Sequence, residues 1–194
     1  MSITSSSPTI HRGRPTTSNE VGSVPAVAGL TAIEYGGSDI LRKTVFTFTN
    51  FTQAITDNTT NGAQGGTKIY DFPTGALIFV GTPVTNLTIA RVGSAIAAGA
   101  AVVASLGSAT VSNANATLTS TEADILPSTT ATLTSGSGNV YSSNSATLQI
   151  GASASNAAAD MYLNFAIPDA DCSGNDSLTI NGTIEVTWIL LGSR

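Results

Sequence analysis

Short stretches in which apolar and polar residues alternate place the strongest constraint on the fold of this chain of 194 residues. The clearest of them is RKTVFTFTNFTQAI, residues 42–55. In an extended backbone it places Phe46 and Phe48 on one face and Val45 and Thr47 on the other. A period of two is typical of a strand that is buried on one side only.

Similar runs follow along the chain and are separated by Gly, Asn, Ser and Pro, which favour turns. Further extended segments are expected at 67–73, 76–81, 85–92, 102–111, 115–128, 145–153 and 160–169. No convincing amphipathic helix accompanies them, and 41% of the residues are hydrophobic, enough to form a core. Many short strands with turn signals predict an all-β domain, a β-sandwich or jelly-roll-like fold of antiparallel strands.

The last apolar region, SLTINGTIEVTWILLG (177–192), predicts two strands joined at Asn181–Gly182. Asn-Gly accepts the positive φ angles that a type I′ hairpin turn requires. The second of these strands is expected to bury one face, formed by Ile184, Val186, Trp188 and Leu190.

Residues 1–40 differ from the rest because they contain Pro8, Pro15 and Pro25, many Ser and Thr, and few large apolar residues in sequence. Such a segment does not pack by itself. The expected organisation is an extended N-terminal arm over residues 1–40 and a β-sandwich domain over residues 41–194. The arm is expected to be ordered by lying across a neighbouring molecule, with plain disorder as the alternative.

Charged residues make up only 10% of the chain, and their signs are unevenly distributed. No Lys or Arg lies between Val92 and Ser193, whereas six of the seven basic residues precede this region: Arg12, Arg14, Arg42, Lys43, Lys68 and Arg91. Such asymmetry favours head-to-tail association or a partner of opposite charge, with chance as the alternative. Neither nucleic acid nor a membrane is an expected partner, because basic residues are not interleaved with aromatics and the apolar run at 95–106 is too short to span a bilayer.

Residues with catalytic chemistry do not form a recognisable set. The single histidine, His11, lies in the arm, and Cys172 has no second histidine to activate it. Glu122 and Asp124 are a close carboxylate pair, but the aromatic residues of a sugar-cleaving cleft do not accompany them. The sequence therefore predicts a protein that is not an enzyme and that needs no cofactor.

The loop DADCSGND (169–176) resembles the first half of a calcium-binding loop. Its twelfth position is Ile180 where a bidentate Glu is required, and its flanks are predicted strands rather than helices. The preferred interpretation is an acidic loop between strands without a bound metal. Weak cation binding stays open for Asp169, Asp171 and Asp176.

The segment GGTKIYDFPTGALIFVG (65–81) concentrates charged and aromatic residues that are scarce elsewhere. A regular strand would place Lys68 and Tyr70 on one face and Asp71 on the other. Aromatic residues with few charges are typical of interface cores. Candidate contacts with another subunit or with a partner are Arg12, Arg14, Arg42, Lys43, Lys68, Tyr70, Asp71 and Phe72; an ordinary strand end within one monomer is the alternative.

Four segments, 65–81, TEADILPST (121–129), ADMYLNFAIPDAD (159–171) and 177–192, occur in an order that resembles a group of tailed-bacteriophage virion proteins. These are the capsid decoration, or cement, proteins, and the similarity covers residues 40–192. The resemblance implies a β-rich structural protein, often a homotrimer, on the outside of the phage head. There it would clamp adjacent subunits of the major capsid protein. It carries over no catalytic residues.

A single cysteine fits assembly in the reducing cytoplasm of a bacterial host, before the protein reaches the capsid exterior of the virion. Two rival functions stay open. The first is a receptor- or glycan-binding adhesion module of a phage fibre or head, with 169–176 as its candidate loop. The second is a depolymerising enzyme that uses Glu122 and Asp124.

Overall fold

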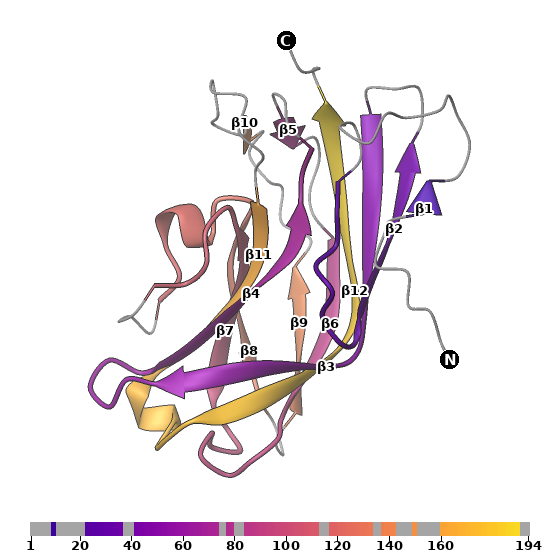
Figure 1. Ribbon diagram of the computed structural model, residues 1–194. Coiled ribbons are helices and arrows are strands. Elements are labelled where there is room, and N and C mark those ends of the chain that lie inside the picture. Colours follow the sequence, from indigo (N-terminus) through magenta and orange to yellow (C-terminus); the bar gives the residue numbers. More distant parts are fainter. Residues whose placement is uncertain are drawn as a thin grey trace.

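The computed structural model describes residues 9–10, 22–36, 41–73, 77–79, 84–112, 117–133, 137–142, 149–150 and 160–190. Most of them form β-strands of one curled, mainly antiparallel sheet whose two halves face each other (Figure 1). This arrangement confirms the predicted all-β, sandwich-like fold. The helices of the described residues are two single 3-10 turns, η1 (Ser120–Glu122) and η2 (Asp169–Asp171). Within these residues no helix has the length and apolar character needed to cross a bilayer.

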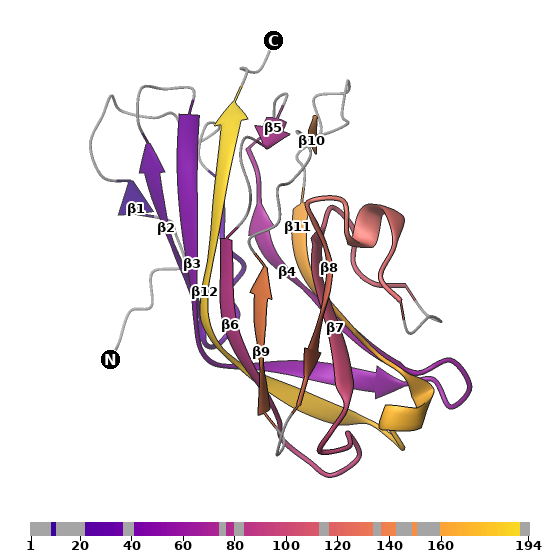
Figure 2. The ribbon, with the colours of Figure 1, turned by 180° about the vertical axis from the view of Figure 1, so that it is seen from behind.

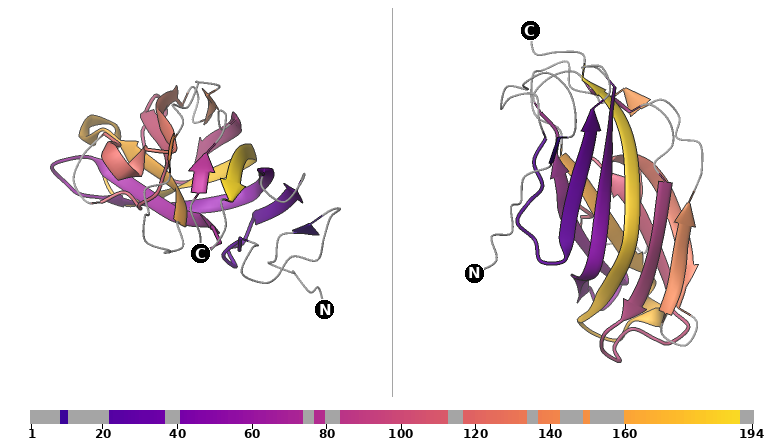
Figure 3. Two further views of the ribbon diagram at one scale, coloured as in Figure 1. Left: turned by 90° about the horizontal axis from the view of Figure 1, so that it is seen from above. Right: turned by 90° about the vertical axis from the view of Figure 1, so that its right-hand side faces the viewer.

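Two long strands, β3 (Leu41–Asp57) and β12 (Asp176–Leu190), pair with each other from one end of the molecule to the other. The first half of the sheet, layer A, adds β2 (Leu30–Gly36) beside β3 and adds the following strands beyond β12: β5 (Leu77–Phe79), β6 (Val84–Arg91), β9 (Ser137–Ser142) and β10 (Gln149–Ile150). Figure 3, right, looks onto layer A, where β2, β3, β12, β6 and β9 lie side by side.

The second half, layer B, begins where the end of β3 pairs with the start of the next strand. It continues in the order β4 (Ala63–Asp71), β11 (Asp160–Ile167), β7 (Ala101–Gly107) and β8 (Leu126–Thr132). Viewed from behind, β7 and β8 lie to the right of β6 and β9 of layer A (Figure 2). One continuous hydrophobic core fills the space between the two layers.

Both long strands bend where they pass from one layer to the other (Figure 1). At this point Asn50 has a φ of 49° and Gly182 a φ of 125°, and the register of the pair skips one residue between Ile180 and Gly182. The Asn50 N–H donates to Asn181 Oδ1 at 2.7 Å. The bend is therefore a β-bulge shared by two paired strands.

The hairpin predicted at Asn181–Gly182 is wrong, because β12 runs through this dipeptide as one strand. It is flanked by β3 on one side and by β6 on the other, so the chain cannot reverse there. Gly182 does adopt the positive φ that Asn-Gly favours, but it does so at the β-bulge and not in a turn. A Cβ on Gly182 would also collide with the Asn86 carbonyl oxygen.

The inward faces largely match the predicted alternation. Phe46 and Phe48 are buried, and the bulge then shifts the phase so that Phe51 points inward as well. In β12 the expected buried face is confirmed for Ile184, Val186 and Trp188, whereas the Leu190 side chain lies outside the described residues.

The predicted arm is wrong over residues 22–36, which belong to the domain. Val24 and Leu30 are buried in the core, and β2 pairs with β3 along its whole length. Ser23 and Asp71 exchange two backbone hydrogen bonds of 2.8 Å. Of residues 1–21 the structure describes only β1 (Thr9–Ile10), which pairs in parallel with β2.

Candidate interaction surface

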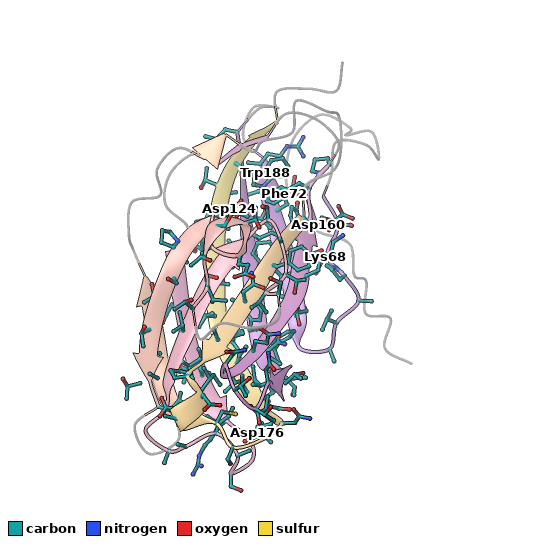
Figure 4. All side chains as sticks on the ribbon, turned by 90° about the vertical axis from the view of Figure 1, so that its left-hand side faces the viewer. Lys68, Phe72, Asp124, Asp160, Asp176 and Trp188 are labelled. Carbon is teal, nitrogen blue, oxygen red and sulfur yellow. The ribbon has the colours of Figure 1, made fainter. Side chains whose placement is uncertain are left out.

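Tyr70 and Phe72 were expected to meet a neighbouring molecule, but both are fully buried in an aromatic cluster. The ring centroids of Tyr70 and Phe72 are 4.8 Å apart, and Phe72 lies 5.3 Å from Trp188. Figure 4 shows Phe72 and Trp188 close together at one end of the domain. Edge-to-face packing of this kind stabilises a core and leaves these rings unavailable to a partner.

A β-bulge in β4 explains why the sequence prediction failed there. Tyr162 pairs with Lys68 and Met161 pairs with Tyr70, so Ile69 is an extra residue without a partner position. The bulge turns both Ile69 and Tyr70 inward. A strict period of two cannot anticipate two buried residues in succession.

Arg42 was also expected at an interface, but it forms a buried ion pair with Glu34. Arg42 Nη1 donates to Glu34 Oε1 at 2.7 Å, and their side chains are 6% and 0% exposed. The guanidinium carbon lies 5.3 Å from the ring centroid of Trp188, which contributes a cation–π contact. Glu34 had been assigned to the arm, so no sequence signal linked these two residues.

Tyr70 completes this buried network from layer B. Its hydroxyl donates to Glu34 Oε2 at 2.5 Å. Burial, and then the nearby Glu34 carboxylate, raise the pKa of Tyr70 far above its usual value, so the hydroxyl keeps its proton. Trp188 Nε1 donates to Thr44 Oγ1 at 2.9 Å beside it. The network fixes β2 to β3 and to the facing layer.

The remaining predicted contact residues form ion pairs within the chain. Lys43 Nζ lies 2.5 Å from Glu185 Oε2 on the outer face of layer A. Lys68 Nζ lies 2.6 Å from Asp160 Oδ1 and 3.3 Å from Asp71 Oδ2, and Figure 4 shows Lys68 beside Asp160. Arg12 and Arg14 lie outside the described residues.

The pKa of Lys68 reflects two opposed effects. Partial burial lowers this pKa, but hydrogen bonds to Asp160 and Asp71 outweigh burial and raise it above its ordinary value. These pairs are partly exposed, so each contributes little to stability. They keep Lys68 and Asp71 close to the domain instead of free for a partner.

The Glu122 and Asp124 carboxylates hold the segment between β7 and β8 in place. Glu122 Oε1 accepts the Ser112 N–H at 2.8 Å, and Asp124 Oδ1 accepts the Ser108 N–H at 2.8 Å. Beneath this segment, the fully buried Asn164 donates to the Glu122 carbonyl oxygen at 2.9 Å. The contacts of both carboxylates are those of structural residues.

The candidate cation loop uses its carboxylates in the same way. Asp171 Oδ2 accepts the Ala101 N–H at 2.9 Å, and Asp176 accepts N–H groups of Gly93 at 2.8 Å and Ile96 at 3.0 Å. Burial raises the pKa of Asp176, but these backbone hydrogen bonds outweigh burial and lower it. Within the part of the chain that the structure describes, no cluster of three His, Cys, Asp or Glu side chains is arranged to hold a metal ion.

Cys172 lies within this loop as a free, buried thiol. Its Sγ donates to the Gly174 carbonyl oxygen at 3.2 Å. Burial raises the pKa of the thiol, which keeps it in its unreactive protonated form. His11, the histidine that could have activated it, lies outside the described residues.

The surface that sequence reasoning missed is the outer side of β2. Ile33 and Tyr35 of β2 are 40% and 45% exposed, and Leu41 at the start of β3 is 47% exposed; we call these three residues the edge patch. They share one face of layer A, because Ile33 pairs with Val45 and Tyr35 with Lys43. The alternation in LTAIEYG (30–36) was the available signal, but the proline-rich surroundings concealed it.

Strand β2 is also an edge of the sheet. It has β3 on one side, and along its other side the described residues provide only Thr9–Ile10 of β1. An edge strand exposes unpaired backbone groups to which an extended segment can add. The edge patch and the free side of β2 together form the candidate interaction surface. Searches against family models, curated proteins and solved structures give no match to this chain.

Proposed function

We propose that this chain is a non-enzymatic decoration, or cement, protein of a tailed-phage head. It binds the outer surface of the capsid, clamps adjacent major capsid protein subunits and acts as a homotrimer. The observation that carries the proposal is the edge strand β2, which exposes Ile33 and Tyr35 and has only Thr9–Ile10 of the described residues along its outer side.

The edge suits this role because it is formed in advance of binding. The buried pair of Glu34 and Arg42 holds β2 in place, so little ordering entropy is lost when a partner docks. Large exposed apolar side chains beside a free strand edge are the features that bind extended segments of another protein. On a capsid the same contact repeats many times, so modest affinity per copy gives stable coverage.

The charge pattern and the segments that resemble phage cement proteins support the same proposal. Basic residues precede residue 92, and acidic residues dominate the rest. Such asymmetry helps copies to orient on a repetitive lattice. The ion pairs and carboxylate–backbone contacts of the described residues stabilise the domain itself, as expected for a protein that must stay rigid on a particle.

Co-sedimentation with phage heads that lack this protein tests the proposal. Ile33→Ser/Tyr35→Ser is expected to reduce bound protein at least tenfold, because both apolar contacts are lost, each worth about 1 kcal/mol or more. Val92→Ser is the matched control, since Val92 is the most exposed large apolar residue described but lies away from β2. Equal binding of both variants would refute the role of the edge patch.

Copy number on purified virions tests the capsid role independently of the edge patch. Hundreds of copies per particle and a trimeric mass in light scattering are expected. About a dozen copies would place the protein at the neck or tail instead. Binding to host glycans on an array, without binding to heads, would favour the adhesion-module alternative.

A deletion tests the role of the N-terminal segment, and the structure determines where that deletion can end. Removing residues 1–40 would delete β2 and leave Arg42 buried without Glu34, so loss of binding would reflect unfolding. Removing residues 1–21 retains the ion pair and β2. That shorter variant is expected to stay folded by circular dichroism and to bind heads less tightly than the full chain.

A further inference from the structure

We propose that the edge of β2, along which the described residues place only Thr9–Ile10, receives the N-terminal strand of a second copy of this chain, so that neighbouring molecules exchange their β1 strands. The inference rests on the proposed function, because a crowded capsid surface brings the copies together. Beyond the proposed function, the inference names β1 as the segment that binds and β2 as the strand that receives it.

The occupant is indicated by the strand that the structure places at this edge. Thr9 pairs with Ile33 and Ile10 pairs with Glu34, in parallel. A strand of two residues covers only a small part of β2, which extends from Leu30 to Gly36. The N-terminal segment of a second copy has the same sequence and therefore makes the same contacts.

The receiving edge lacks the features that natural proteins use to block strand addition. Residues 30–36 contain no proline, the outward side chains Thr31, Ile33 and Tyr35 carry no charge, and the register with β3 has no shift. Strand β8, at one end of the main strand order, is different, because it contains Pro127 and has a register shift against β7. Nothing in the sequence or register of β2 therefore opposes strand addition.

The receiving edge is also rigid. Glu34 sits in the middle of β2 and is held by Arg42 of β3 and by Tyr70 of the facing layer. Its neighbours Ile33 and Tyr35 point outward and are partly exposed. A chain that crosses from a neighbouring molecule covers this apolar surface, which stabilises the exchanged arrangement.

The connecting segment is long enough for exchange. Eleven residues separate Ile10 from Gly22, and an extended chain of that length spans up to about 40 Å. A connection of this length holds the strand of the same molecule at an effective concentration of about a millimolar. Exchange therefore competes poorly in dilute solution and becomes favourable when copies are concentrated side by side.

Exchange needs no new type of contact, because each copy gives one strand and receives one. A ring of copies related by rotation gives every β2 edge a β1 strand, which is compatible with the proposed trimer. The fraction of exchanged molecules rises with protein concentration, and this dependence makes the inference testable with purified protein.

Cysteine cross-linking of purified full-length protein, without heads, tests the exchange. Thr9→Cys and Ile33→Cys variants are mixed in equal amounts, oxidised and digested with trypsin, and links between peptides 1–12 and 13–42 are measured by mass spectrometry. Such a link can form only between two molecules. The Thr9→Cys/Ile33→Cys double variant reports the same pairing within one molecule.

The expected result is an intermolecular link whose yield rises about tenfold for a tenfold increase in protein concentration while exchange is rare. A mixture of Thr9→Cys with Val92→Cys is the control and should give no comparable link, since Val92 is exposed but lies away from β2. Wild-type protein shows the background from its buried Cys172.

Two outcomes would overturn the inference. If the double variant links internally but the mixture does not link at any concentration, each arm stays on its own β2. If neither sample links, β1 does not pair with β2 at all. Both outcomes leave head binding untouched, so the failure of exchange is distinguishable from the failure of the proposed function in the co-sedimentation assay.

Discussion

Replacing Arg42 by Met is expected to be among the most damaging single changes in this domain. The substitution keeps much of the side-chain volume but leaves the Glu34 carboxylate, which is fully buried, without its cation. Removing one partner of a buried ion pair costs about 3–5 kcal/mol, because the remaining charge stays desolvated and uncompensated. The Trp188 ring loses its cation–π contact at the same time.

Most of this loss in stability comes from the unpaired Glu34 carboxylate, and a double variant separates that contribution from lost packing. In the Glu34→Leu/Arg42→Met double variant no charge is buried, so the loss should fall well below that of Arg42→Met alone. The Tyr70 hydroxyl then loses its carboxylate acceptor, at a cost of about 1–3 kcal/mol. Adding Tyr70→Phe to the double variant removes this hydroxyl and is expected to recover most of the stability lost through it.

Urea denaturation measures these free energies of unfolding. Trp188, the single tryptophan, reports local structure by fluorescence, and circular dichroism reports the β-sheet. Lys43→Met is the matched control, because it breaks the adjacent but exposed pair with Glu185 and should cost less than about 1 kcal/mol. A loss below about 1 kcal/mol for Arg42→Met, or a larger loss in the double variant, would refute the reasoning.

Three further predictions concern other parts of the domain. The Asp176 carboxylate has a lowered pKa in the folded state, so its contribution is present above the usual value of 3.8 and is lost as pH falls through the folded value. Asp176→Asn should therefore lower the free energy of unfolding by about 1–2 kcal/mol near pH 7. In urea titrations below pH 3.8 the gap in stability between variant and wild type should shrink; a gap that does not change with pH would contradict this. Gly182→Ala should destabilise the domain by about 1–3 kcal/mol, because its φ of 125° is strained for alanine and a Cβ would meet the Asn86 carbonyl; an unchanged midpoint in urea would contradict this. Cys172 should react with a thiol reagent at pH 8 far more slowly in native protein than in urea, since burial raises its pKa; similar rates would show that the thiol is accessible.

The strand pattern could be read from the sequence because half-buried strands impose a period of two on side-chain polarity. Phe46 and Phe48 in β3 and Val186 and Trp188 in β12 follow this rule, and all four are buried as expected. The rule fails at bulges, where an added residue changes the phase without a reliable sequence mark. Tyr70 was misplaced for this reason.

The candidate site was the least predictable part of the molecule. The sequence led to the prediction that Arg42 lies at the surface, because a charged residue is seldom buried unless it is paired. Its partner Glu34 precedes it by eight residues, in a segment that looked like an arm. The edge patch was concealed for the same reason, since Ile33 and Tyr35 become a surface only after β2 joins the sheet.

The sequence by itself determined the all-β class, most of the strands and the inward face of the long ones, because these depend on local alternation and on turn residues. The tertiary structure alone decided which charges are buried, where strands continue instead of turning, and which edge stays open. Asn181–Gly182 illustrates the difference: its backbone preference is local, but strands on both sides convert a turn into a bulge. Pairing between residues far apart in the chain carries that information, and no local pattern contains it.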